Sequence, residues 1–264
     1  MFDAARFERA RQELGGALGT SLHVAAETGS TNDDALAAAR DGARHGATFV
    51  AEHQTAGRGR RGRRWHAEPG ANLLFSVVLR LELPLDVVPA LALASGLAVR
   101  AAIERALSPA GTQSGRVLVK WPNDVWMDQK KIAGVLAESQ IQGDALAAAV
   151  VGVGVNVGTT HFPPELAASA TSLALAANGA APPREQLLAE ILHQLENTLR
   201  LLACGGVCAL QNELMRYDAL AGRPVRVEDV SGVACGIDAA GRLLLRMNDG
   251  DVRAMAGGSV ELID

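Results

Sequence analysis

The sequence predicts an α+β protein: a mixed, largely antiparallel sheet flanked by helices, followed by a small C-terminal β-barrel. Three observations predict this fold class. Helical periodicity spans 87–107 and 184–203, and β-branched or alternating apolar runs recur along the chain. Residues 131–139 and 145–157 can pair across the turn at Gln142, Gly143 and Asp144. The candidate strands lie too close together for the helical crossovers that parallel pairs need.

The first third of the chain alternates helices and strands. It contains a helix over 3–14, a strand over 22–27, a helix over 30–43, and strands over 48–53 and 72–80. Ser30 or Thr31 is expected to cap the second helix by accepting a hydrogen bond from a free backbone N–H. Asp33 and Asp34 place negative charge in its first turn, where the helix dipole favours it.

The remaining elements suggest two units. A strand over 117–121 ends at Pro122-Asn123-Asp124, and a helix over 206–219 follows the one over 184–203. From Arg223 onward short alternating strands are separated by glycine-rich turns, which is typical of a small barrel that must pack on a larger neighbour. We therefore expect a main domain over 1–220 and a second domain over 221–264.

Composition limits the functional classes. The chain has 264 residues, 48% of them hydrophobic, a formal charge of −4 and a pI near 5.9, so overall charge gives no reason to expect DNA or a membrane as partner. The N-terminus has no apolar signal-like region, which predicts a cytoplasmic protein. Three cysteines, two of them one helical turn apart, favour reduced structural thiols and no bound metal.

The most unusual segment is the loop over 57–65, which carries five arginines within residues 58–64 and three glycines. Guanidinium groups bind phosphate and carboxylate in pairs of hydrogen bonds, and glycine lets a backbone approach a ligand closely. The loop therefore predicts an anion site, although a solvated basic loop with nonspecific RNA affinity fits the composition too.

Two familiar nucleotide motifs do not explain this loop. Gly57, Gly59 and Gly62 match the spacing of a dinucleotide fingerprint, but Pro69-Gly70 follows Gly62 after only six residues, too few for the helix that the motif requires. The sequence also has no G-x-x-x-x-G-K-[S/T] motif, so any ATP site is not of the P-loop kind.

Other candidate residues follow strand ends. Asp124 could orient a metal or accept a proton, and Lys131 could neutralise a carboxylate or phosphate in a transition state. An ordinary Asn-Asp turn and a surface lysine would fit the same residues. Gly152 and Gly154 share one strand face, where the missing side chains leave room for a ligand or for a closely packed helix.

Taken in order, five segments resemble the biotin protein ligases. They are Gly29-Ser30-Thr31-Asn32, Gln54 to Trp65 with its Gly-Arg-Gly-Arg-Arg-Gly core, Lys120-Trp121-Pro122-Asn123-Asp124, Lys131-x-Ala133-Gly134 and Gly152-x-Gly154-x-Asn156. The resemblance covers about residues 22–200, and the tail is similar to that family's SH3-like barrel. It implies a class II synthetase-like biotin/lipoate ligase fold.

The resemblance also implies a reaction. Biotin and Mg-ATP give biotinyl-5′-adenylate and pyrophosphate, and a lysine of a carboxylase's biotin carboxyl carrier domain then takes the biotinyl group. ATP with Mg²⁺ and biotin would be substrates, with no permanently bound metal. Only about twenty residues precede the first catalytic strand, too few for the DNA-binding domain of some relatives, so we expect no DNA partner. A homodimer is compatible with the family.

Residue roles carry over from the motifs. The catalytic candidates are Lys131, Arg60 and Asp124. Biotin binding is expected from Ser30, Thr31, Asn32, Gln54, Gly57, Arg58, Gly59, Arg60, Lys131 and Gly134. Adenylate or ATP binding is expected from Arg58, Arg60, Arg61, Trp65, Asn123, Lys131, Gly154 and Asn156. The alternatives are a lipoate or octanoate ligase of the same fold and a noncatalytic RNA-binding module that uses the arginine loop.

Overall fold

A computed structural model describes residues 1–107, 117–177, 179 and 181–263. Its larger part is built on a seven-stranded sheet with strand order β1-β2-β3-β7-β6-β5-β4. The strands are β1 (Leu22–Thr28), β2 (Thr48–Gln54), β3 (Leu73–Leu79), β4 (Val117–Lys120), β5 (Asp124–Met127), β6 (Lys130–Gln142) and β7 (Ala145–Val155). Among these described strands only β1 and β2 pair in parallel, which confirms the predicted mixed, largely antiparallel sheet.

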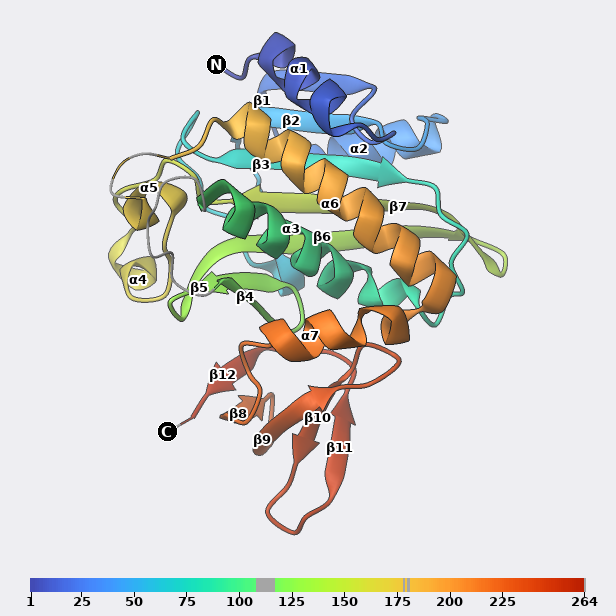
Figure 1. The fold of residues 1–264 in the computed structure, drawn as a ribbon, viewed down its shortest axis with the longest axis vertical. Helices are drawn as coiled ribbons and strands as arrows, with labels where there is room; N and C mark the ends of the chain where they lie inside the picture. The colour runs from blue at the N-terminus through green and yellow to red at the C-terminus, as the bar shows by residue number, and fades with distance from the viewer. Residues whose placement is uncertain (108–116, 178, 180, 264) are drawn as a thin grey trace.

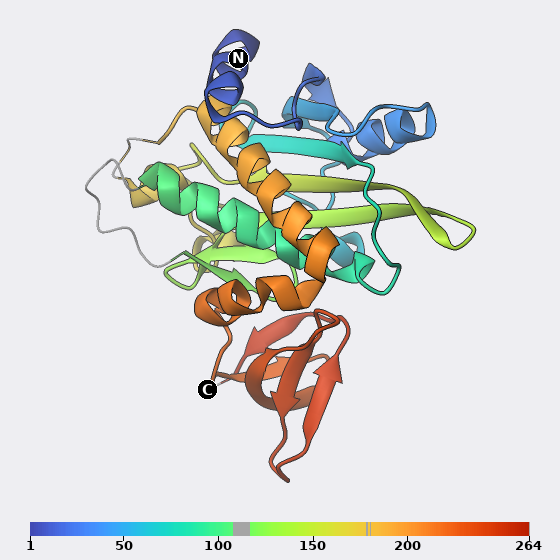
Figure 2. The ribbon, with the colours of Figure 1, turned by 45° about the vertical axis from the view of Figure 1, so that its right-hand side comes forward.

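Helices cover both faces of this sheet. The long helices α3 (Leu91–Leu107) and α6 (Arg184–Gly205) pack on each other across one face, with α1 (Ala4–Leu14) against α6 (Figures 1 and 2). The opposite face carries α2 (Thr31–Arg40), which contacts β2, β3 and β7. The two helical layers bury separate apolar clusters, a large one under α3 and α6 and a small alanine- and valine-rich one under α2.

The remaining helical segments are short. They are η1 (Arg60–Gly62), η2 (Val88–Ala90), α4 (Pro164–Ala167), α5 (Leu173–Ala176), η4 (Val207–Leu210) and α7 (Gln211–Tyr217). Segment α7 lies between the large sheet and the C-terminal strands (Figure 1).

The C-terminal strands form a five-stranded antiparallel sheet in the order β11-β10-β9-β8-β12. The strands are β8 (Pro224–Val227), β9 (Val230–Ile237), β10 (Leu243–Arg246), β11 (Val252–Met255) and β12 (Val260–Leu262). This sheet lies at the end of the molecule opposite α1 (Figure 1). Asp264, the last residue assigned to this unit, lies outside the described residues.

Several local predictions need correction. The predicted capping of α2 is wrong: Ser30 occupies the N-cap position without a side-chain capping bond, and the N–H of Thr31 donates instead to Gln54 Oε1 at 2.8 Å. Helix α2 also ends at Arg40, before the predicted 43. Strand β5 was not predicted as a strand, because only four residues form it directly after the turn at Pro122.

No helix within the described ranges combines the length and apolar character needed to cross a membrane.

Candidate active site

A cavity of about 330 Å³ lies between the large sheet and the arginine loop, residues 57–65. All of the predicted site residues line it except Gly57 and Arg61. Those that do are Ser30, Thr31, Asn32, Gln54, Arg58, Gly59, Arg60, Trp65, Asn123, Asp124, Lys131, Gly134, Gly154 and Asn156. Arg61 points to the C-terminal sheet, where it forms an ion pair with Glu228.

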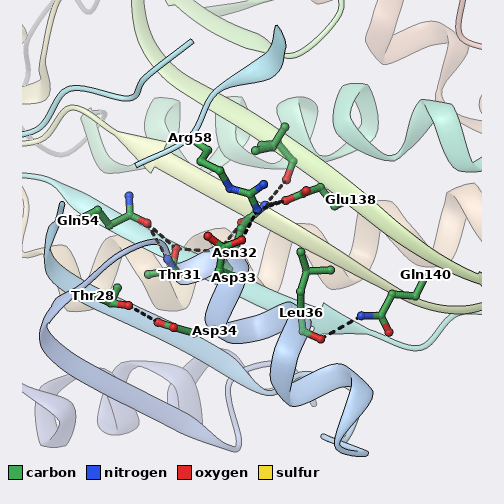
Figure 3. Close-up of polar contacts among 12 residues, drawn as sticks. Thr28, Thr31, Asn32, Asp33, Asp34, Leu36, Gln54, Arg58, Glu138 and Gln140 are labelled. Carbon is green, nitrogen blue, oxygen red and sulfur yellow. Dashed lines mark hydrogen bonds and ion pairs between the residues drawn. The ribbon is translucent and has the colours of Figure 1, made fainter. Parts of the chain in front are cut away.

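Uncharged polar side chains of α2 and β2 line one end of the cavity. Gln54 Oε1 at the end of β2 accepts from the backbone N–H of Thr31 at 2.8 Å and from its hydroxyl at 3.0 Å (Figure 3). The Thr31 hydroxyl lies 2.8 Å from that of Ser76, which donates to Asn32 Oδ1 at 2.6 Å. Thr31, Asn32 and Ser76 are all buried, so these bonds fix the orientation of each side chain.

The chain of hydrogen bonds continues from Asn32 to the arginine loop. Asn32 Nδ2 donates to Glu138 Oε2 at 2.7 Å, and the same carboxylate oxygen accepts from Arg58 Nη2 at 2.8 Å (Figure 3). Arg58 Nη2 also lies 2.7 Å from Asp33 Oδ1 in the first turn of α2. The first helix turn, the middle of β6 and the arginine loop are therefore joined by charge-assisted contacts.

Glycines of β6 and β7 make room for side chains that line the cavity. A Cβ on Gly152 would lie 1.8 Å from Asn32 Oδ1, and one on Gly154 would lie 2.4 Å from the ring of Trp65. A Cβ on Gly134 would approach the Trp65 ring and the Lys131 side chain to 3.0 Å. The room that the sequence predicted is therefore used by side chains that line the cavity. The indole Nε1 of Trp65 is buried and has no hydrogen-bond partner among the described residues.

The other end of the cavity is cationic. Lys131 Nζ lies 2.7 Å from Asp124 Oδ1 and 5.3 Å from the centre of the Trp65 ring. The register of β5 against β6 pairs Asp124 with Gly134 and Lys131 with Trp126, so the two residues lie at opposite ends of this short hairpin and their side chains meet between those ends. Arg60 Nη1 donates to Asn123 Oδ1 at 3.3 Å, and the Asn123 amide donates to Val135 O at 2.6 Å.

Arg60 and a further lining cation, Lys120, are partly buried, which disfavours their charged forms. Burial lowers the pKa of Arg60, with a further decrease from Arg61, while Asp124 opposes it. Burial likewise lowers the pKa of Lys120, whose Nζ donates to Val260 O at 2.8 Å and lies over the Trp126 ring. Desolvation disfavours a charged group, so both side chains gain from an anion brought into the cavity.

The segment 158–172 closes one wall beside Lys131. The N–H of Lys131 donates to Ser169 O at 2.7 Å, and the N–H of Thr171 donates to Lys131 O at 2.9 Å. Phe162 and Leu166 from this segment line the cavity. The backbone of this wall and that of Lys131 therefore form one hydrogen-bonded unit.

Four further lining residues lie in the predicted motifs without an assigned role: Arg63, Arg64, Lys120 and Gly152. Sequence reasoning missed the other lining residues, which are His66, Phe75, Trp126, Val135, Leu136, Val153, Phe162, Leu166, Ser169 and Ala170. Ser76 and Glu138 were also missed as partners of lining residues. The signal that could have found Ser76 is its place as the single polar residue of the fully buried strand β3.

Comparison with known proteins shows the family to which the chain belongs. Residues 27–156 match the biotin/lipoate A/B protein ligase family, and residues 221–263 match the biotin protein ligase C terminal domain. The biotin–[acetyl-CoA-carboxylase] ligase of Mycobacterium tuberculosis is 39% identical over 249 residues, which cover 91% of this chain and 89% of the relative. The bifunctional ligase/repressor BirA of Escherichia coli is 32% identical, over 96% of this chain and 77% of its own length.

A solved structure agrees with these relatives. Biotin protein ligase from Aquifex aeolicus in complex with biotin and ATP superposes with a TM-score of 0.76 at 26% identity, covering 92% of this chain and 99% of the other. The two family matches, the Mycobacterium tuberculosis relative and the solved structure therefore agree. The chain belongs to the biotin protein ligases of the biotin/lipoate A/B protein ligase family.

Proposed function

We propose that this protein activates biotin with ATP, forming biotinyl-5′-AMP and pyrophosphate, and transfers the biotinyl group to a lysine of the biotin carboxyl carrier domain of a carboxylase. The observation that carries the proposal is that one cavity is lined both by uncharged polar side chains, Thr31, Asn32 and Gln54, and by the cations Arg58, Arg60 and Lys131. Biotin has the same division, with a neutral ureido head and a carboxylate at the end of an apolar chain. The reaction uses ATP, so the proposal places the protein in the cytoplasm.

The polar end suits the head of biotin. Thr31, Asn32 and Gln54 present hydroxyl and amide groups whose orientations are fixed by buried hydrogen bonds. Fixed donors and acceptors in an otherwise apolar pocket select a ligand by its hydrogen-bonding pattern. Ser30, 2% exposed at the N-cap of α2, adds a hydroxyl at the same end.

The cationic end suits the activation step. In that step a biotin carboxylate oxygen attacks the α-phosphorus of Mg-ATP, and the bond to the β-phosphate breaks as pyrophosphate leaves. Two anions repel each other by several kcal/mol at close range in a site shielded from water. Arg58, Arg60 and Lys131 line the same cavity, and we infer that they offset the repulsion.

The transfer step needs a different environment. The neutral amine of the acceptor lysine attacks the acyl carbon, AMP leaves and the ammonium proton is lost. Residues of the arginine loop, Trp65 among them, line the cavity opposite the sheet, and we infer that the loop keeps water from the acyl-adenylate until the lysine arrives. Asp124 lies among three cations, which supports a role in positioning Lys131.

We further propose that residues 1–220 and 221–264 are separate units and that the second braces the site. Lys120 donates to Val260 O at 2.8 Å, and Trp121 Nε1 donates to Gly241 O at 2.9 Å. These contacts attach the C-terminal sheet to the strand end that carries Asn123 and Asp124.

ATP–pyrophosphate exchange tests the proposal. Wild-type protein should exchange labelled pyrophosphate into ATP when biotin is added, and not when lipoate or octanoate is added. It should then label a carboxyl carrier domain at one lysine. Exchange that depends on lipoate, or salt-sensitive RNA binding without any exchange, would contradict it.

A further inference from the structure

We infer that Glu138 is a positioning residue that joins the polar end of the cavity to the arginine loop. The inference rests on the proposed function for the identity of the ligand. It rests on geometry for the coupling itself: one oxygen, Oε2, accepts from Asn32 Nδ2 at 2.7 Å and from Arg58 Nη2 at 2.8 Å (Figure 3).

The first consequence concerns Asn32. An amide side chain can present either its oxygen or its nitrogen, but an ionised carboxylate can only accept hydrogen bonds. Glu138 therefore holds the Asn32 nitrogen, and the oxygen is left for Ser76 and for a ligand. A ligand N–H, such as one of a cyclic urea, would meet an acceptor at this position.

The second consequence concerns the loop. Arg58 Nη2 is bound by Glu138 and by Asp33, so two carboxylates hold one arginine of an otherwise mostly exposed segment. Because the same Glu138 oxygen serves Asn32, the orientation of the amide and the position of the loop depend on each other. A ligand that stabilises Asn32 in this orientation also stabilises the closed loop, and this coupling must be reciprocal.

Gln140 provides a matched control. It lies two residues further along β6 and also ties this strand to α2, through a hydrogen bond from Nε2 to Leu36 O at 3.0 Å (Figure 3). It touches neither Asn32 nor Arg58 in the described hydrogen bonds. A variant at Gln140 therefore removes a tether between the same two elements without breaking the proposed link.

The experiment measures biotin binding by isothermal titration and tryptic cleavage within residues 58–64, in the full-length protein. Glu138→Gln removes the charge and lets the side chain present a donor to Asn32. We expect biotin to bind about tenfold more weakly, the effect of losing about 1.4 kcal/mol. We expect the free protein to be cleaved in the loop about threefold faster or more, since cleavage follows the open population. Gln140→Ala should change neither value, and Glu138→Asp, which keeps a pure acceptor, should be intermediate.

The outcomes separate this inference from the proposed function. Wild-type protein that does not bind biotin would contradict the function, while the cleavage rates of the free variants would still decide the role of Glu138. If Glu138→Gln matches Gln140→Ala in cleavage and in binding, the inference is wrong. If its thermal midpoint falls with no selective change in either readout, Glu138 supports only the fold.

Discussion

Replacing Gly152 with alanine tests whether the small residues of β7 exist to admit the Asn32 side chain. The added Cβ would lie 1.8 Å from Asn32 Oδ1, whereas real Cβ contacts are essentially never shorter than 3.0 Å. Asn32 would have to move by more than about 1 Å to reach an ordinary nonbonded separation. Its bonds of 2.6 Å to Ser76 and 2.7 Å to Glu138 cannot both survive such a shift.

The expected magnitude follows from these contacts. Forcing an extra methyl group into a packed interior costs about 1–3 kcal/mol, which should appear as a loss in the free energy of unfolding. Loss of a hydrogen bond to a charged partner costs about 1.5–3 kcal/mol. Because the displaced amide is a proposed biotin ligand, we expect biotin affinity to fall about tenfold to a hundredfold at 1.4 kcal/mol per decade.

Urea denaturation and calorimetric titration with biotin measure the two effects. Gly96→Ala is the matched control, because a Cβ at that buried position in α3 would meet Val119 Cγ1 at an ordinary 3.5 Å. That variant should be more stable by about 0.5–1 kcal/mol, since alanine is favoured over glycine in a helix. A Gly152→Ala protein as stable as the wild type, with biotin affinity within a factor of two, would refute the reasoning.

Three further predictions concern charge. Arg60→Gly should release the adenylate and label proteins indiscriminately, because the arginine that closes the cavity is lost; a streptavidin blot with unchanged selectivity would exclude this lid role. Asp124→Asn should slow both pyrophosphate exchange and transfer about tenfold or more, since Lys131 loses a partner at 2.7 Å; slowing of transfer alone would indicate proton transfer. Burial raises the pKa of Asp218 above its ordinary value of 3.8, so ionising this carboxyl destabilises the folded protein. This destabilisation is absent below about pH 3.8 and reaches its full size once the pH exceeds the raised folded-state pKa. Asp218→Asn keeps an acceptor for the Leu220 N–H, and urea midpoints should show its gain over wild type larger at neutral pH than at low pH; an equal gain at both would contradict the burial argument.

The sequence allowed the main elements to be predicted because their signals are local. Strand β6 pairs with β7 across the expected turn, and α3 and α6 follow the expected apolar periodicity. The start of α2 was placed within a residue, but its capping was not. Gln54 lies 23 positions from Thr31 in sequence, and no local pattern shows that its side chain reaches that helix terminus.

In the site, too, local sequence patterns could be predicted and contacts between distant segments could not. Arginine clustering and glycine alternation are visible in the sequence, and both proved to surround one cavity. The role of Glu138 was not visible, because the strand was predicted over 131–139 and a polar residue near a strand end is typical of a solvent-facing position. Its meaning depends on three segments converging, and only the sheet register and the placement of α2 reveal that convergence.

Asp124 lies near three cations, Arg60, Lys120 and Lys131, and this arrangement favours a positioning role over proton transfer. Burial lowers the pKa of Arg60 and of Lys120, and the charge of Asp124 opposes that lowering at both; Asp124 is also the ion-pair partner of Lys131. One carboxylate thus offsets part of the mutual repulsion of three cations, two of which are also disfavoured by burial. Its removal changes the field at every one of them, so binding and both chemical steps must change together. A residue whose only task was to accept a proton from the acceptor lysine would leave pyrophosphate exchange unaffected, and the asparagine variant separates the two roles.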